Sequence, residues 1–258
     1  MRNLRLIPRL DVKMEWLIKG VQMEGWRKVG DPAEYARAYA DAGADELIFM
    51  DVVASLYERN SLHDIIEKVA SAVFVPMTVG GGIRTVDDVS KMLACGADKV
   101  ALNTAATRHP ELISEVANRF GSQATVISIE AIRNNDSWLA MTDNGRNHTG
   151  RDVIDWAVEA EERGAGELLI TSIDRDGLGS GFELELIKQV SDKVSIPVVS
   201  GGGLGSVAHL DEVIAQTKTS AVAVGHALHW NKVHMTDLRH TLKENGCFVR
   251  KLDEAHTH

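Results

Sequence analysis

The fold is indicated by the stretch VPMTVGGG at residues 75–82, which recurs 121 positions later as IPVVSGGG at residues 196–203. The same offset places GADEL at residues 43–47 over GAGEL at residues 164–168. The repeating unit is thus about half of the 258-residue chain, longer than the repeats of a solenoid, which span roughly 20–50 residues. We expect two similar halves that join into one structure, because no low-complexity linker separates them.

Short apolar runs alternate with longer amphipathic stretches along the sequence. Eight runs have strand length: 4–10, 47–53, 74–79, 100–103, 124–129, 168–173, 196–200 and 221–224. Helix-start signals lie between them, such as Asp31-Pro32, Thr85 and Ser206. Strands and helices that alternate at a mean spacing of about 30 residues predict a parallel sheet. Eight such units favour a closed (β/α)8 TIM barrel of two half-barrels, a single domain over residues 1–258 with a frayed tail at 251–258.

The composition is that of an ordinary globular protein, with 44% hydrophobic residues, 25% charged residues and a net charge of −9. The acidic balance argues against nucleic-acid binding. No apolar stretch of about 20 residues and no N-terminal signal region are visible, so we expect no membrane span. Two cysteines, Cys95 and Cys247, are too few for a disulfide framework and favour a reducing compartment, so the cytoplasm is the expected location.

Acidic residues end several of the predicted strands, and the active site of such a barrel lies at those carboxyl ends. Asp11 ends the first strand and Glu130 ends the fifth, at corresponding positions of the two halves with an offset of 119 residues. Two carboxyl groups that face each other can act as general acid and general base. A single acidic residue at a strand end more often caps a helix, but the matched pair favours catalysis.

Two glycine triplets, Gly80–Gly82 and Gly201–Gly203, follow the third and seventh strands. Glycine lets backbone N–H groups approach an anion at a helix N-terminus. Two such loops predict two phosphate sites, completed by Asn103-Thr104 and by Gly225, and therefore a substrate with a phosphate at each end. Two tight turns without a ligand explain each triplet equally well when it is taken alone.

Charged residues also recur at the starts of strands: Arg5, Glu46, Lys99 and Glu167 begin the first, second, fourth and sixth. Strand alternation puts Arg5 and Asp11 on the same side of the first strand, so Arg5 lies at the bottom of the barrel if Asp11 lies at the top. We predict a salt-bridged ring that closes the bottom. Separate surface ion pairs, which contribute little stability, are the alternative.

Neither a metal site nor a cofactor site is predicted. The ten histidines show no metal-ligand spacing, and we expect His226 and His229 to be structural. No G-x-G-x-x-G follows the first strand, and no nucleophile elbow or Ser-His-Asp set is visible.

Nine segments complete the pattern: 7–13 (IPRLDVK), 19–20 (KG), 30–32 (GDP), 45–47 (DEL), 78–83 (TVGGGI), 96–100 (GADKV), 103–106 (NTAA), 120–123 (FGSQ) and 171–177 (TSIDRDG). With these segments the chain resembles the cyclase subunit of imidazole glycerol phosphate synthase along almost its whole length. A sister barrel, the isomerase that precedes this enzyme in histidine synthesis, shares the half-barrel repeat but fits the segments less well.

The resemblance implies an ammonia-dependent lyase of histidine biosynthesis without a cofactor. In that family a glutaminase partner docks on the bottom face, and its ammonia passes through the barrel to a bisphosphorylated ribulosyl aminoimidazole carboxamide nucleotide. The products are imidazole glycerol phosphate and an aminoimidazole carboxamide ribotide.

The resemblance also assigns roles to positions of this sequence. Asp11 and Glu130 match the acid–base pair, Lys19 matches the lysine of a mobile loop, and Asp98 matches a partner-contact acid. The ring of Arg5, Glu46, Lys99 and Glu167 matches an ammonia gate. Substrate and phosphate positions are matched by Gly82, Asn103, Thr104, Asp176, Gly177 and Gly203.

Three residues depart from the family pattern. Glu130 replaces an aspartate, which moves the carboxylate outward by one methylene, and a misplacement near 1 Å can cost about 100-fold in rate. Arg9 replaces a small residue inside the barrel. A buried guanidinium needs an acidic partner, here Asp11 or Glu130, and lowers the pKa of that partner. The side chain of Arg9 also narrows the route that ammonia takes through the barrel. Gly225 replaces a serine that faces phosphate.

These departures leave two alternatives open. One is a paralogue whose barrel receives ammonia from a glutaminase for amidination of a surface-polysaccharide sugar. The other is a non-catalytic scaffold that activates a glutaminase.

Overall fold

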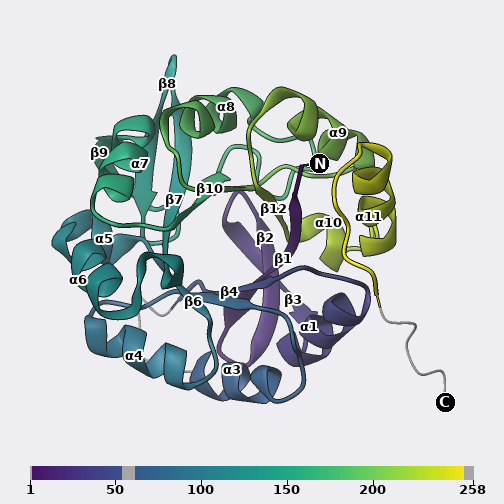
Figure 1. Ribbon diagram of the computed structural model, residues 1–258, viewed down its shortest axis with the longest axis horizontal. Coiled ribbons are helices and arrows are strands. Elements are labelled where there is room, and N and C mark those ends of the chain that lie inside the picture. Colours follow the sequence, from purple (N-terminus) through teal and green to yellow (C-terminus); the bar gives the residue numbers. More distant parts are fainter. Residues whose placement is uncertain (1, 54–61, 253–258) are drawn as a thin grey trace.

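Eight parallel strands close into a barrel at the centre of the molecule, inside a ring of helices (Figure 1). The computed structural model describes residues 2–53 and 62–252, so most of the predicted tail at 251–258 lies outside the described residues. The barrel strands are β1 (Arg5–Lys13), β4 (Leu47–Asp51), β5 (Met77–Gly80), β6 (Lys99–Leu102), β7 (Thr125–Asn134), β10 (Glu167–Ser172), β11 (Val198–Gly201) and β12 (Ala221–Val224). Each pairs with its neighbours in parallel, and the pairing of β7 with β10 closes the ring. The predicted (β/α)8 barrel is confirmed.

The outer ring consists of helices that return the chain from one strand to the next. They are α1 (Pro32–Asp41), α3 (Leu62–Ala70), α4 (Val86–Ala94), α6 (Glu111–Phe120), α7 (Val153–Glu162), α8 (Leu184–Lys193), α9 (Val207–Gln216) and α11 (Met235–Glu244). Shorter helical turns are α5 (Thr104–Arg108), η1 (Ser122–Ala124) and α10 (His226–His229). The predicted starts hold: Asp31 accepts N–H bonds as the N-cap of α1, and Thr85 forms a capping box with Asp88 at α4. Ser206 precedes α9 but makes no side-chain cap bond.

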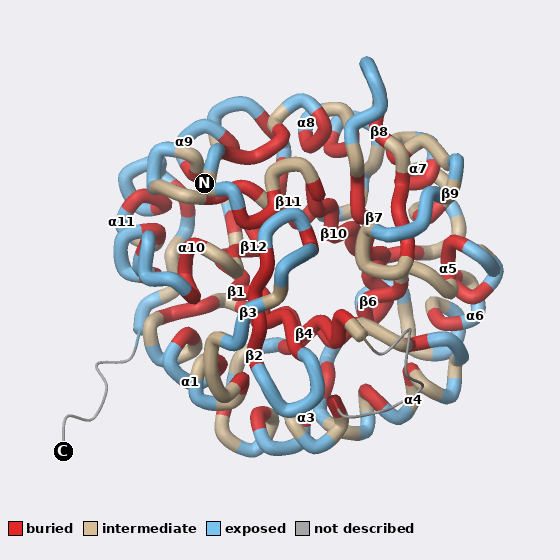
Figure 2. The backbone as a smooth tube through the Cα atoms, turned by 180° about the vertical axis from the view of Figure 1, so that it is seen from behind, coloured by how far each residue is buried: buried red, intermediate tan, exposed pale blue. Residues whose placement is uncertain are grey.

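Two antiparallel hairpins, which the sequence reading did not predict, extend the barrel at corresponding places of its two halves. β2 (Trp16–Val21) and β3 (Glu24–Gly30) follow β1, and β8 (Ser137–Thr142) and β9 (Asn147–Asp152) follow β7. The β2–β3 hairpin extends beyond the carboxyl end of β1, and its outer part is exposed (Figure 2).

Apolar side chains form two layers on the two faces of the strands. The outer layer packs the strands against the helices and includes Phe49 and Trp156. The inner layer fills the space along the barrel axis, called the lumen below, and includes Ile7, Val126 and Leu169. Burial on both faces explains why the strands read as continuous apolar runs rather than as alternating patterns.

Among the strand starts, that of the third predicted strand differs most from the prediction. The third apolar run was expected to form a strand at residues 74–79, but β5 begins at Met77, and Phe74 is 93% exposed. Pro76 explains the later start, because proline has no N–H to donate to a neighbouring strand.

Candidate active site

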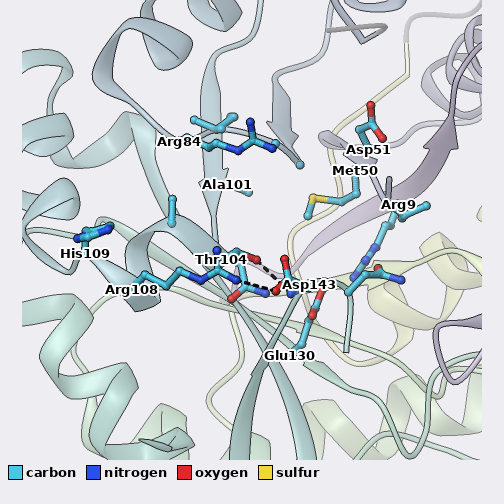
Figure 3. Close-up of a pocket in the computed structure, with 17 residues that line it drawn as sticks. Arg9, Met50, Asp51, Arg84, Ala101, Thr104, Arg108, His109, Glu130 and Asp143 are labelled. Carbon is cyan, nitrogen blue, oxygen red and sulfur yellow. Dashed lines mark hydrogen bonds and ion pairs between the residues drawn. The ribbon is translucent and has the colours of Figure 1, made fainter. Parts of the chain in front are cut away.

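The carboxyl ends of the strands form the mouth of the barrel, which contains two cavities. The larger has a volume of about 310 Å³, and the predicted residues that line it are Gly82, Asn103, Thr104 and Glu130 (Figure 3). The smaller has a volume of about 20 Å³ and is lined by Lys19, Asp176, Gly177, Gly203 and Gly225. The residues predicted for the two phosphate sites therefore lie on two sides of one mouth. Arg9 lines both cavities.

Asp11 is completely buried at the end of β1 and is held by two cations. Its Oδ1 accepts a hydrogen bond of 2.8 Å from Arg9 Nε, and its Oδ2 accepts one of 2.8 Å from Lys19 Nζ. Burial alone would raise the pKa of Asp11, but Arg9 and Lys19 outweigh it and hold that pKa well below its usual range. Asp11 is therefore ionised, and of the two acidic partners predicted for Arg9, Asp11 and Glu130, the structure pairs it with Asp11.

Lys19 is carried to the mouth by the β2–β3 hairpin. Its ammonium group bonds Asp11 and lies 3.0 Å from Oδ2 of Asp176, which follows β10. The hairpin is fixed to the same loop by the Gln22 N–H, which donates to the Asp176 carbonyl at 2.8 Å. Burial lowers the pKa of Lys19, but the two aspartates outweigh burial and raise it, so Lys19 is charged.

Glu130 is also buried, on β7, but its carboxyl group accepts a hydrogen bond from a neutral donor. Its Oε2 accepts from the Gly145 N–H, on the loop between β8 and β9, at 2.8 Å. Burial raises the pKa of Glu130 to about 7, although Arg9 opposes the shift. Asp11 and Glu130 thus differ in their affinity for a proton: the pKa of Asp11 is lowered and Asp11 is ionised, whereas the pKa of Glu130 is raised to about 7.

The two glycine loops need glycine for steric reasons. Gly81 and Gly203 have φ angles of 98° and 112°, a region that L side chains rarely adopt. A Cβ at Gly203 would lie 2.1 Å from the carbonyl oxygen of Gly181, and one at Gly81 would lie 2.2 Å from that of Asp51. The close approach of one backbone segment to another explains why both loops are tight turns of glycine. Phosphate binding in the cavities beside these loops stays a prediction.

Charged residues that the sequence reading did not single out complete the larger cavity. Arg84, Arg108 and Asp143 line it, and Arg108 Nη2 lies 2.9 Å from Asp143 Oδ2 (Figure 3). The Asp143 N–H donates to Thr104 Oγ1 at 3.1 Å, which ties the second hairpin to the start of α5. The Asn144-Gly145 turn was the available signal, because Asn-Gly marks a hairpin.

The backbone of β1 at Arg9 is supported from outside the barrel. His229 Nε2 lies 3.0 Å from the Arg9 carbonyl, and His229 Nδ1 lies 2.7 Å from the hydroxyl of Tyr39 on α1. Burial lowers the pKa of His229 to about 4, so this histidine is neutral. A neutral ring that accepts from Tyr39 and donates to Arg9 satisfies both nitrogens, and the predicted structural role of His229 fits these contacts.

The four predicted ring residues meet at the bottom of the barrel, opposite the mouth. Arg5 bonds Glu46 at 2.7 Å and Glu167 at 2.5 Å, and Lys99 bonds the same glutamates at 3.0 and 2.9 Å. Their side chains are between 8% and 19% exposed, so the ring is largely shielded from water rather than a set of surface pairs. Asp98 lies beside this end, where its carboxylate accepts the Met77 N–H at 2.8 Å.

Within residues 2–53 and 62–252, no group of three or more His, Cys, Asp or Glu side chains is arranged to hold a metal ion. In the same part of the chain, no helix combines the length and the apolar character that crossing a membrane requires.

Comparisons with known proteins agree with this geometry. A family model described as "Histidine biosynthesis protein" matches residues 5–234. A relative from Legionella pneumophila, the imidazole glycerol phosphate synthase subunit HisF, is 62% identical over 208 residues, which cover 80% of this chain and 98% of the relative.

Proposed function

Because the chain belongs to the histidine biosynthesis protein family, we propose that it is the cyclase subunit of an imidazole glycerol phosphate synthase, a lyase. Its reaction converts the bisphosphorylated ribulosyl aminoimidazole carboxamide nucleotide and one ammonia into imidazole glycerol phosphate, the aminoimidazole carboxamide ribotide and one water. The observation that carries this proposal is the pair of buried carboxyl groups at one mouth, Asp11 bonded by two cations and Glu130 by a backbone N–H.

We assign the base to Asp11 and the acid to Glu130. When ammonia adds to the ketone carbon, the ionised Asp11 accepts a proton from the attacking nitrogen and the protonated Glu130 gives a proton to the oxygen. The reverse transfers restore both groups as the hydroxyl takes a second proton from Asp11, Glu130 takes a second proton from the nitrogen, and water leaves. When that nitrogen then attacks the carbon next to the aminoimidazole carboxamide, Glu130 gives a proton to the leaving amine, which keeps the electron pair of the broken carbon–nitrogen bond, and Asp11 takes the proton that the attacking nitrogen loses. Groups in fixed positions that transfer protons in this way contribute about 10²–10⁴-fold to a rate.

We assign the two ends of the substrate to the two cavities. The larger cavity, lined by Gly82, Asn103 and Thr104, takes one phosphate. The smaller, lined by Gly177, Gly203 and Gly225, takes the other, and its volume of about 20 Å³ requires Lys19 to move outward first. Gly225 has no side chain, so only its backbone N–H can donate a hydrogen bond to this phosphate, whereas a serine at this position would also offer a hydroxyl.

The partner in this proposal is a glutaminase subunit that docks on the bottom face, as a heterodimer, and delivers ammonia into the lumen. The closed ring of Arg5, Glu46, Lys99 and Glu167 supports this assignment, because it forms a gate at the entry. Asp98 and the exposed Phe74 lie at the same end of the barrel and would contact the partner. A cytoplasmic location stays a prediction that rests on the two free cysteines, Cys95 and Cys247.

The comparisons give no support to the two alternatives, a barrel that serves sugar amidination and a scaffold without catalysis. Both remain distinguishable by experiment, since only the cyclase turns over the nucleotide with ammonium alone.

The test is turnover of the bisphosphate nucleotide by the purified chain with ammonium salts. Asp11→Asn and Glu130→Gln should each lower turnover by about 10²–10⁴-fold, because each removes one proton-transfer group. The matched controls Asp155→Asn on α7 and Glu115→Gln on α6 change exposed carboxylates of the outer helices and should leave turnover unchanged. Absence of turnover by the folded parent chain would refute the proposal.

A further inference from the structure

The side chain of Arg9 crosses the lumen. Its Nε bonds Asp11 on its own strand at 2.8 Å, and its Nη1 donates to Thr171 Oγ1 on β10 at 3.0 Å. In the closed ring β10 is separated from β1 by β11 and β12, so the guanidinium reaches from one half-barrel to the other. Arg9 is 5% exposed, which means that this crossing lies inside the barrel and not over its surface.

Below Arg9 the lumen is packed with apolar side chains, among them Ile7, Ile48, Val126 and Leu169, and the ion ring closes its lower end. Ser128 lies on the same face of β7 as Val126 and Glu130, because side chains alternate along a strand. Its buried hydroxyl has no hydrogen-bond partner among the described residues, so the lumen contains an unused polar group that a passing ammonia molecule could bond.

We propose that Arg9 closes the upper end of the lumen, so that ammonia enters the mouth from below only when the guanidinium leaves Thr171. This inference rests on the proposed function, because it concerns the route by which that reaction receives ammonia. The barrel then has two closures in series: the ion ring at its entry and the Arg9–Thr171 contact at its exit.

The geometry also gives the direction in which the upper closure opens. Thr171 and Glu130 are paired in register on neighbouring strands, so the end of the guanidinium already lies beside the Glu130 carboxyl group. Rotation about the bond to Asp11 would exchange Thr171 for Glu130 as the second contact of Arg9. Asp11 would keep its partner throughout, and the lumen would join the mouth.

The experiment compares two sources of ammonia in the same variants. Turnover with ammonium salts, which enters from the mouth, measures the chemistry, and turnover with glutamine and the bound glutaminase subunit measures passage through the lumen. Thr171→Val removes the far contact of Arg9 but keeps its bond to Asp11, and it should raise the glutamine-to-ammonium ratio about tenfold, as expected for loss of one hydrogen bond to a charged group. Arg9→Ala should raise the ratio as well. The control Thr241→Val makes the same change in a buried threonine of α11 and should leave the ratio at its native value.

Each outcome decides the question. The inference is overturned if Thr171→Val and Arg9→Ala leave the ratio of glutamine-dependent to ammonium-dependent turnover unchanged. It is also overturned if this ratio is zero in the native chain and in all variants. A changed KM for the nucleotide with an unchanged ratio assigns Arg9 to substrate binding instead. If ammonium supports no turnover in the native chain, the proposed function fails, and a crystal structure then tests the closure alone. The guanidinium should bridge Asp11 and Thr171 there, whereas a guanidinium turned into the mouth above an open lumen would overturn the inference.

Discussion

Asp11, Arg9 and Lys19 are three buried ionic groups, and the burial of each charge depends on the presence of the others. Asp11 accepts hydrogen bonds from both cations, and Lys19 also bonds Asp176. A buried charge that loses its partner keeps the cost of leaving water without the compensating attraction. Each member of this set is therefore far more costly to remove alone than a comparable residue on the surface.

Lys19→Met should lower the free energy of unfolding by about 3–5 kcal/mol, because it leaves Asp176 and one oxygen of Asp11 without a cation. The control Lys68→Met removes an exposed cation that lies 3.3 Å from Asp31, and its effect should stay within about 0.5 kcal/mol. Urea denaturation at pH 7 measures both. Equal effects of the two substitutions would contradict the view that burial makes the Lys19 pairs important.

Glu130→Gln should stabilise the fold in a pH-dependent way. The raised pKa of Glu130, about 7 against an ordinary 4.5, means that the folded state favours the protonated carboxyl. The stability that this proton contributes is complete below about pH 4.5 and is lost as pH rises through about 7. The glutamine variant, which cannot ionise, should match the parent near pH 4 and exceed it by up to about 3 kcal/mol at pH 8. Denaturation curves across this range, with Glu115→Gln as the exposed control, measure the difference; a pH-independent offset would disprove the assignment.

The same pKa of Glu130 predicts the pH profile of catalysis. If Glu130 is the acid, kcat/KM falls as pH rises through about 7, because the carboxyl loses the proton that it must give. The concentration of unprotonated ammonia must be held constant at each pH. A profile that rises through the same range would exchange the roles of Asp11 and Glu130.

At the scale of elements, the two hairpins complete the site at the mouth of the barrel, because each brings a hydrogen-bond donor to a buried carboxyl group. The first brings Lys19 to Asp11, and the second brings Gly145 to Glu130. Apolar runs and helix caps predicted the barrel, since eight buried strands leave a strong signal. The hairpins left a weak one, because their outer residues are exposed and the turns of the first use Met14 and Gln22 at positive φ rather than glycine; only the second has a glycine signal, at Asn144-Gly145. For this reason the sequence placed Asp11 and Glu130 correctly but missed Asp143 and the exact partners of Lys19.

Two glycines of the first hairpin provide a matched pair of substitutions. A Cβ at Gly20 would lie 2.0 Å from the carbonyl oxygen of Glu24, whereas a Cβ at Gly25 would meet no atom within 4 Å. Gly20→Ala should displace the neighbouring Lys19 and lower ammonium-dependent kcat/KM at least about tenfold. Gly25→Ala should cost about 1 kcal/mol of stability, because Gly25 has a φ of 62°, and should keep activity. Similar activity in the two variants would show that the hairpin tolerates distortion.

At the scale of the whole molecule, the two ends of the lumen differ in how they hold together. The bottom ring uses four charges, and each of its members bonds two others. The sequence predicted this ring because its four charged residues all begin predicted strands, and the repeat relates two of them, Glu46 and Glu167. The Arg9–Thr171 contact could not be predicted in the same way, because its two residues are related by no repeat and meet only through closure of the barrel.

The ring should therefore behave cooperatively. Lys99→Met leaves one oxygen of each glutamate unpaired and the ring with one surplus negative charge, and Glu46→Gln then removes that surplus. We expect the double variant to be more stable than the sum of the single effects predicts, by about 1–2 kcal/mol. Urea denaturation of the parent, the two single variants and the double variant measures this coupling energy. Additive effects would show that the four residues act as independent pairs.

The ring also constrains how such barrels can diverge. Because no one of its four charges can be lost without leaving another unbalanced, descendants of a common ancestor should inherit positions 5, 46, 99 and 167 as a block or replace them together. Aligned relatives would then show these positions covarying. Thr171, which offers Arg9 a neutral hydroxyl, carries no such constraint and is free to differ between lineages, whereas Arg9 itself is tied to the buried charge of Asp11.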